Sequence, residues 1–211
     1  MAELDLTPDD TFAFTKQAGG VLLIACGALG REIVSLIEAN RWQAFDVTCL
    51  PAILHNYPDR IPEAVRGKIR EARRKYRSIY VLYGDCGTGG LLDRVLEEEQ
   101  VERIGGPHCY AFFSGQDVFR ETEDEDITAF FLTDDLARHF DKLVWEGLGM
   151  DKHPELLPMY FGNYTKIVYL AQTHDTALVA KAKAAAEKLG LAYEFRFTGY
   201  GELEREMKAR S

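Results

Sequence analysis

Apolar runs of strand length alternate with helical patterns along most of the chain. The run at residues 21–26 is uniformly apolar, and residues 29–41 then carry apolar positions at helical spacing. Further runs that suit strands lie at residues 45–50, 78–83, 101–105, 166–171 and 191–197. This alternation predicts an α/β fold with a mostly parallel sheet, crossover helices and Rossmann-like layers.

The other predicted helices cover residues 59–77, a stretch after Gly90, residues 132–149 and residues 175–190. No repeat, low-complexity segment or linker interrupts these elements. Since 211 residues suit one core, we expect a single domain over residues 19–211, preceded by an arm over residues 1–18.

The composition limits the classes of partner and the cellular compartment that we expect. The 25 basic and 34 acidic residues give a net charge of −9, which argues against nucleic acid. No apolar run approaches the ~18 residues of a membrane helix, so we expect no membrane partner. Residues 1–15 contain acidic residues but no basic one, which is unlike a secretory signal. We therefore expect a cytoplasmic protein whose four cysteines are reduced.

Cysteine and histidine gather where predicted strands end. The residues with this placement are Cys26, His55, Cys86, His108 and Cys109. Because ligands of parallel sheets bind outside the carboxyl ends of the strands, we predict one shared metal or cluster site. Cys49 instead lies inside a predicted strand and is expected to be a core residue.

The spacing of these residues suits an assembled site and not a zinc finger, because there is no C-x2-C pair. We expect Cys26, Cys86 and Cys109 to be metal ligands, with His55 or His108 as a fourth ligand or a proton carrier. Zinc is the first choice, since it accepts thiolates and imidazole in a tetrahedron. A [4Fe–4S] cluster, a corrinoid cobalt and a metal-free nucleophilic cysteine beside His108 remain open.

The glycine-rich loop at residues 84–90 is expected to approach a ligand closely. Its glycines match neither the dinucleotide-binding fingerprint nor the Walker loop, which disfavours a nucleotide. We expect the cofactor to contact Gly27, Gly87, Thr88 and Gly89, because glycine lets the backbone come close.

Several other polar groups have structural interpretations. The helix at residues 59–77 carries eight basic and three acidic residues. It is either a solvated face or a docking surface for an acidic partner such as a corrinoid carrier, with Arg70, Arg73 and Arg74 as test positions. Helix-start or structural roles are expected for Asp134, Asp135, His139, His153 and His174, while Gln172, Thr173 and the loop at residues 198–201 could join a pocket.

A series of motifs in order resembles the domain-of-unknown-function family numbered 1638. They are Ile24-Ala-Cys-Gly-Ala-Leu29, Leu50-Pro-Ala-Ile-Leu-His-Asn56, Tyr83-Gly-Asp-Cys-Gly-Thr-Gly-Gly90, Gly106-Pro-His-Cys-Tyr110, Phe131-Leu-Thr-Asp134, Tyr160-Phe-Gly-Asn-Tyr164, Val168-Tyr-Leu-Ala-Gln172 and Thr198-Gly-Tyr-Gly201. The resemblance spans about residues 20–205. It implies genomic proximity to corrinoid-dependent methyltransferases of the trimethylamine type, which is an association and not an activity.

Together these observations lead to one function and two rivals. The first is a metal-dependent methyltransferase, or a component of one, in corrinoid-linked one-carbon metabolism. It would act on a small-molecule substrate and have a corrinoid protein or a methyltransferase as partner. The rivals are a non-catalytic protein that binds or carries a metal, iron–sulfur cluster or corrinoid, and an iron–sulfur lyase.

Overall fold

The computed structural model describes residues 11–15, 20–122 and 124–211. It is an α/β structure with two largely parallel sheets, which confirms the predicted class. The chain forms two compact units, which we call unit 1 (Met1–Cys109 and Leu203–Ser211) and unit 2 (Tyr110–Glu202). The single domain over residues 19–211 stays a prediction. Of the predicted arm, residues 1–10 and 16–18 lie outside the described residues, and Phe12–Phe14 form strand β1.

Unit 1 contains a five-stranded sheet in the order β1-β3-β2-β4-β5, and all its strands except β1 are parallel. The strands are β1 (Phe12–Phe14), β2 (Val21–Cys26), β3 (Phe45–Leu50), β4 (Ser78–Leu82) and β5 (Glu102–Arg103). The helices are η1 (Gly27–Leu29), α1 (Gly30–Ala39), η2 (Ala52–Asn56), η3 (Pro58–Arg60), α2 (Ile61–Ala72), α3 (Leu91–Glu99) and α9 (Gly201–Lys208).

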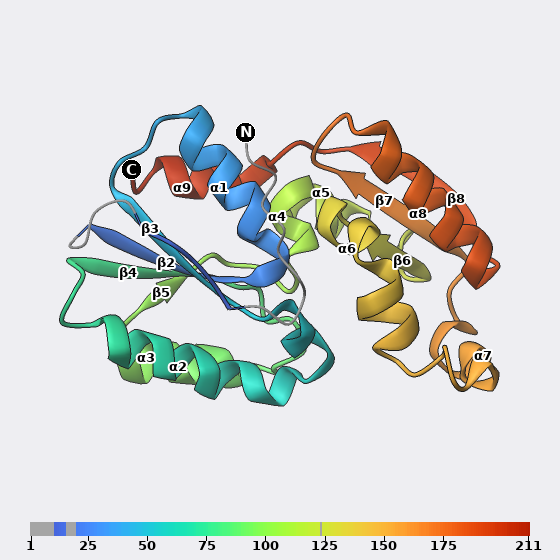
Figure 1. Cartoon of the computed structure of the whole chain (residues 1–211), viewed down its shortest axis with the longest axis horizontal. Coiled ribbons are helices and arrows are strands. Elements are labelled where there is room, and N and C mark those ends of the chain that lie inside the picture. The colour runs from blue at the N-terminus through green and yellow to red at the C-terminus, as the bar shows by residue number, and fades with distance from the viewer. Residues whose placement is uncertain (1–10, 16–19, 123) are drawn as a thin grey trace. The chain divides into compact units, whose positions relative to one another are not determined.

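Strand β2 is buried along its whole length because strands flank it on both sides and helices cover both faces. Helices α1 and α9 lie on one face of the sheet, and α2 and α3 lie on the other (Figure 1). From β2 the chain passes first to β3 on one side and then to β4 on the opposite side. The strand order therefore reverses between β2 and β4, which is the switch point where parallel sheets bind ligands.

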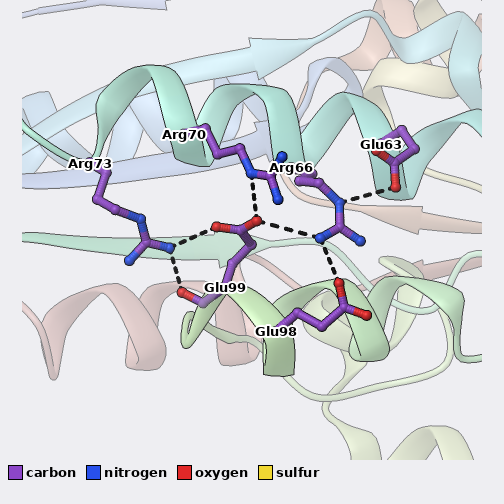
Figure 2. A network of polar contacts seen from close by, with 6 residues as sticks. All are labelled: Glu63, Arg66, Arg70, Arg73, Glu98 and Glu99. Atoms are coloured by element: carbon purple, nitrogen blue, oxygen red, sulfur yellow. Dashed lines mark hydrogen bonds and ion pairs between the residues drawn. The ribbon is translucent and has the colours of Figure 1, made fainter.

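The basic helix predicted at residues 59–77 is α2, and much of its charge is used inside unit 1. Arg66, Arg70 and Arg73 all form ion pairs with Glu99 of α3, whose side chain is 9% exposed (Figure 2). Arg73 also donates to the Glu99 carbonyl. These contacts stabilise the packing of α2 on α3, so reversing Arg70 or Arg73 would break internal ion pairs. Docking of a partner on this helix stays a prediction, with Arg74 as the position that tests it.

Unit 2 contains an all-parallel sheet in the order β6-β7-β8. The strands are β6 (Ala129–Leu132), β7 (Lys166–Ala171) and β8 (Ala192–Phe197). The helical segments are α4 (Tyr110–Ser114), α5 (Gln116–Glu121), α6 (Asp134–Arg138), a π-helical turn (Asp141–Glu146), η5 (Pro154–Leu156), α7 (Leu157–Phe161) and α8 (Thr176–Leu189). None of the helices in the described residues combines the length and the apolar character needed to cross a membrane.

One predicted helix differs clearly from the structure. Residues 132–149 were expected to be continuous, but β6 ends at Leu132 and the helical part is divided between α6 and the π-helical turn. Thr133 caps α6, since its side chain accepts a hydrogen bond from the Leu136 amide. At the other end of the unit, α8 ends as predicted at Gly190, which has φ 70°.

Candidate functional site

The predicted site residues lie at the carboxyl edge of the unit 1 sheet. Cys26 is the last residue of β2, and His55 lies in η2, directly after β3. Cys86 follows β4, and His108 and Cys109 follow β5. Since these four strands are parallel neighbours, their carboxyl ends meet at one edge, as the sequence predicts.

The Cys86 thiol is the centre of the contacts at this edge. It has hydrogen-bond contacts with the Cys109 thiol and with the imidazoles of His108 and His55. The donors therefore come from the ends of β3 and β5 and meet on a side chain that follows β4. Cys86 is 7% and Cys109 8% exposed, whereas His55 is exposed. The thiols are thus shielded from water, and His55 connects them with solvent.

These contacts hold Cys86 in the charged form. The hydrogen bond from Cys109 lowers the pKa of Cys86 far below that of a free thiol, against the cost of burial, and His108 and His55 lower it further. The same hydrogen bond, together with burial, raises the pKa of Cys109. The pair therefore shares one proton, which stays on Cys109 because three donors stabilise the charge on Cys86.

Cys26 lies beside this pair. Its thiol interacts electrostatically with the Tyr83 hydroxyl and with Cys109. Tyr83 is fully buried, and burial followed by the charge of Cys26 raises the pKa of its hydroxyl. Cys49 lies inside β3 with no exposed surface, as predicted for a core residue.

Backbone contacts bring the two cysteine loops together. The Cys86 amide donates to the Pro107 carbonyl over 2.8 Å, and the Asp85 amide donates to the Gly106 carbonyl over 3.0 Å. Cys86 has φ 47°, a conformation that costs energy for any residue with a side chain. Such strain persists where the surroundings impose it, as the paired loops do here.

Two glycines allow this close approach. A Cβ atom on Gly84 would lie 2.9 Å from the His108 backbone, and one on Gly27 would lie 2.9 Å from the Leu50 carbonyl oxygen. Gly84 therefore lets the β4 end reach the β5 end, and Gly27 does the same between β2 and β3. Gly27 thus has a structural role in this approach, and its predicted contact with a cofactor stays a prediction.

The glycine-rich loop is organised by its own aspartate. The Asp85 carboxylate accepts hydrogen bonds from the Thr88 hydroxyl and from the amides of Gly89 and Gly90. Burial opposes the charged form of Asp85, but the hydrogen bonds from Gly90, Thr88 and Gly89 prevail and lower the pKa of Asp85. Thr88 and Gly89 are thus engaged within the loop, and Gly87 has φ 85° and faces Pro58. Their contact with a cofactor stays a prediction.

Arg103 supports the site and was missed by the sequence analysis. Its guanidinium donates to both carboxylate oxygens of Asp93 and to the carbonyls of Tyr83, Ile104 and Gly106. It therefore ties together the segments that lead to Cys86 and to Cys109. The partners are mostly backbone carbonyls, which leave no signal in the sequence.

The donor types at this edge suit a thiophilic metal, but they are not arranged as a finished metal site. Within the part of the chain that the structure describes, no three Cys, His, Asp or Glu side chains already form a group that could hold a metal ion. The side chains are instead joined to one another by hydrogen bonds around Cys86.

Several polar residues named from the sequence lie in unit 2, where they make internal contacts. The Asp134 carboxylate accepts from the Tyr169 hydroxyl, the Gln172 amide and the Thr173 hydroxyl, and so joins the ends of β6 and β7. His139 contacts Asp135, His153 contacts Glu155, and the His174 ring stacks on Phe197 with 4.0 Å between centroids.

Comparison with known proteins gives a family but no function. No curated protein and no solved structure matches the chain. The family model described as "Protein of unknown function (DUF1638)" matches residues 49–207. The match includes His55, Cys86, His108 and Cys109, whereas Cys26 precedes it. Because it covers most of the chain and confirms the resemblance seen in the sequence, the protein belongs to the DUF1638 family.

Proposed function

We propose that the carboxyl edge of unit 1 binds a thiophilic metal, zinc in the first place, and serves methyl transfer in one-carbon metabolism. The observation that supports this most is the meeting of the Cys86 and Cys109 thiols with two imidazoles at one edge of the sheet. A cytoplasmic location follows from this role and is part of the proposal.

A thiol–thiolate pair corresponds to a two-thiolate metal site in which a proton stands in place of the metal. Metal binding to cysteines releases protons, so zinc would displace the proton of Cys109. Cys86 and Cys109 would be two ligands, with Cys26 and His55 or His108 as candidates for the others. Because these side chains now contact one another, binding turns them toward a common centre. A [4Fe–4S] cluster would use the three cysteines.

When bound, the metal would lower the pKa of a substrate thiol and keep it nucleophilic. The chain's own residues complete the site. His55, which is exposed and touches Cys86, carries protons between the buried thiols and solvent. The buried cysteines keep bulk water from the reacting groups. The methyl donor would be a methylated corrinoid on a partner protein, which rests on the family's genomic association alone.

Metal stoichiometry of folded protein tests the metal site directly. Protein purified with and without oxygen should contain one zinc per chain. If the site holds an iron–sulfur cluster in place of zinc, the protein purified without oxygen should contain iron and sulfide and absorb near 400 nm. Cys86→Ser and Cys109→Ser should each lose the metal, because a neutral hydroxyl is a much poorer ligand than a thiolate. Cys49→Ser is the matched control and should keep it, since Cys49 lies in the core. Full metal content in both Cys86→Ser and Cys109→Ser overturns the site.

A metal-free nucleophilic cysteine is the second candidate. It is favoured by the donors that already stabilise the Cys86 thiolate and by the lack of a preformed metal group among the described residues. In this case the Cys86 thiolate forms a bond to an electrophilic carbon of the substrate, the leaving group departs with the electrons of the bond that breaks, and an imidazole supplies the proton that this group takes up. Iodoacetamide should then alkylate Cys86 at the same rate with zinc present or removed by a chelator. Protection by stoichiometric zinc favours the metal site instead.

A further inference from the structure

Strand β8 is an open edge of the unit 2 sheet. Among the described residues it pairs only with β7, and no strand lies on its other side. It runs from Ala192 to Phe197 and contains neither proline nor lysine, which are residues that commonly protect exposed edges. Phe195 is 45% and Phe197 is 50% exposed. An edge of this length with exposed aromatic side chains is suited to pairing with another strand.

The hydrogen bonds to β7 show which peptide groups face outward. The Ala192 amide donates to the Thr165 carbonyl, and the Thr198 amide donates to the Ala171 carbonyl. In a parallel pair the N–H and C=O of one residue point to the same side and successive residues alternate. The even-numbered residues of β8 therefore bond to β7, whereas Tyr193, Phe195 and Phe197 direct both backbone groups to the open edge.

We propose that this edge binds the β8 strand of a second copy of the chain, antiparallel, about a two-fold axis at Phe195. In this register Phe195 faces Phe195 of the partner subunit, and Tyr193 faces Phe197 of the partner subunit. All these residues present outward N–H and C=O groups, so each facing pair exchanges two backbone hydrogen bonds. The two three-stranded sheets become one sheet of six strands.

The side chains of β8 are complementary to themselves in the same register. Side chains alternate between the faces of a strand, so Tyr193, Phe195 and Phe197 line one face and form a ladder of aromatic pairs across the axis. On the other face Glu194 lies opposite Arg196 of the partner subunit, and Arg196 lies opposite Glu194 of the partner subunit. Glu194 and Arg196 already form an ion pair with each other within the strand, so the register extends this pair into an alternating row of charges and places no like charges opposite each other. A two-fold contact of this kind closes without leaving a free edge.

Sedimentation velocity of the full chain at micromolar concentration measures the assembly. The wild type is expected to have the mass of two chains. Phe195→Lys places two like charges opposite each other on the axis and should weaken the dimer by about tenfold or more in dissociation constant. The matched control is Ile127→Lys, because Ile127 is 77% exposed and lies outside β8. It should leave the dimer intact. Circular dichroism establishes that both variants are folded.

A cross-link tests the register separately. The facing residues at the axis have Cα atoms about 5.5 Å apart, which a disulfide can span. Phe195→Cys should therefore form a covalent dimer on mild oxidation, whereas Ile127→Cys should not. A monomeric wild type overturns the proposal. A dimer that survives Phe195→Lys, or one that Phe195→Cys does not cross-link, overturns it as well.

Discussion

The amide of Cys86 donates a 2.8 Å hydrogen bond to the carbonyl of Pro107. This bond joins the loop after β4 to the loop after β5 and brings Cys86 within hydrogen-bond contact of His108 and Cys109. The thiolate is therefore positioned by backbone pairing between neighbouring strand ends. Its charge is then stabilised by side chains that the same pairing delivers.

The first prediction concerns Gly84, which allows these loops to approach. In Gly84→Ala the new Cβ would lie 2.9 Å from the His108 backbone, so the β5 loop must move away. We expect the unfolding free energy to fall by about 1–3 kcal/mol and the reactivity of Cys86 to fall with it. Urea unfolding and iodoacetamide labelling measure the two effects.

Gly67→Ala is the control for Gly84→Ala. Gly67 lies inside α2, and nothing lies within 4 Å of the position that a Cβ atom would take there, so alanine should stabilise the helix by about 0.5–1 kcal/mol. The iodoacetamide labelling of Cys86 should not change in Gly67→Ala. If Gly84→Ala behaves like Gly67→Ala, the close approach of the loops does not position the thiolate.

The sequence predicts the strands with continuous apolar runs best. The run at residues 21–26 matches β2 and the run at residues 45–50 matches β3, because buried strands leave an uninterrupted apolar signal. Strand β6 was missed, since its four residues follow an acidic stretch and lead directly into a helical pattern. The division of the strands between two sheets also has no local signal, because pairing depends on contacts distant in sequence.

The sequence predicts the edge of the sheet at which the site residues gather, but it does not predict which side chains contact one another. Strand ends placed Cys86, Cys109 and His55 at one edge, because parallel strands share a direction. The choice of Cys86 as the thiolate depends on φ 47° and on loop pairing, which a sequence does not display. The self-bonded loop around Asp85 and the role of Arg103 were missed for the same reason.

A second prediction follows from the lowered pKa of Cys86. An ordinary thiol loses about tenfold in alkylation rate for each pH unit below its pKa, because only the thiolate reacts. In metal-free protein, alkylation of Cys86 by iodoacetamide should instead stay nearly constant between about pH 5 and pH 8. Cys86→Ser should remove this component, and Cys49→Ser should retain it. A wild-type rate that falls tenfold per pH unit contradicts the thiolate assignment.

A third prediction concerns Arg103 as a positioning residue. Arg103→Gln loses the ion pair with Asp93 and most of the bonds to the carbonyls of Tyr83, Ile104 and Gly106. We expect a loss of about 2–3 kcal/mol in unfolding free energy and a steeper pH profile of Cys86 alkylation, since the loops separate. Arg103→Lys keeps the charge but not the planar set of donors, so its unfolding free energy and its alkylation profile should be close to those of Arg103→Gln.

The control for Arg103 is Arg120→Gln. Arg120 forms an exposed ion pair with Asp117, and such pairs contribute about 0–1 kcal/mol. Arg120→Gln should change neither the unfolding free energy nor the pH profile of Cys86 alkylation appreciably. An Arg103→Gln protein that is destabilised but keeps a flat pH profile would limit Arg103 to a purely structural role.

The last prediction concerns acid stability in unit 2. Asp126 is buried and accepts hydrogen bonds from Arg196 and Lys166. Burial opposes its charge, but these partners prevail and lower the pKa of Asp126 to about 2. Its folded-state pKa is thus below its unfolded value of 3.8. The carboxylate therefore stabilises the fold above about pH 4, and this contribution is lost as the pH falls through about 2.

Asp126→Asn isolates this contribution. The difference in unfolding free energy between wild type and variant should be about 2 kcal/mol at neutral pH and should shrink as the pH falls from about 4 toward 2, where half of the wild-type carboxyl groups are protonated. Urea unfolding across this pH range measures it. Asp117→Asn is the comparison, because that carboxylate is 90% exposed and should show little difference at any pH. A difference for Asp126→Asn that stays constant down to pH 2 would mean that the ion pairs with Arg196 and Lys166 do not carry its stability.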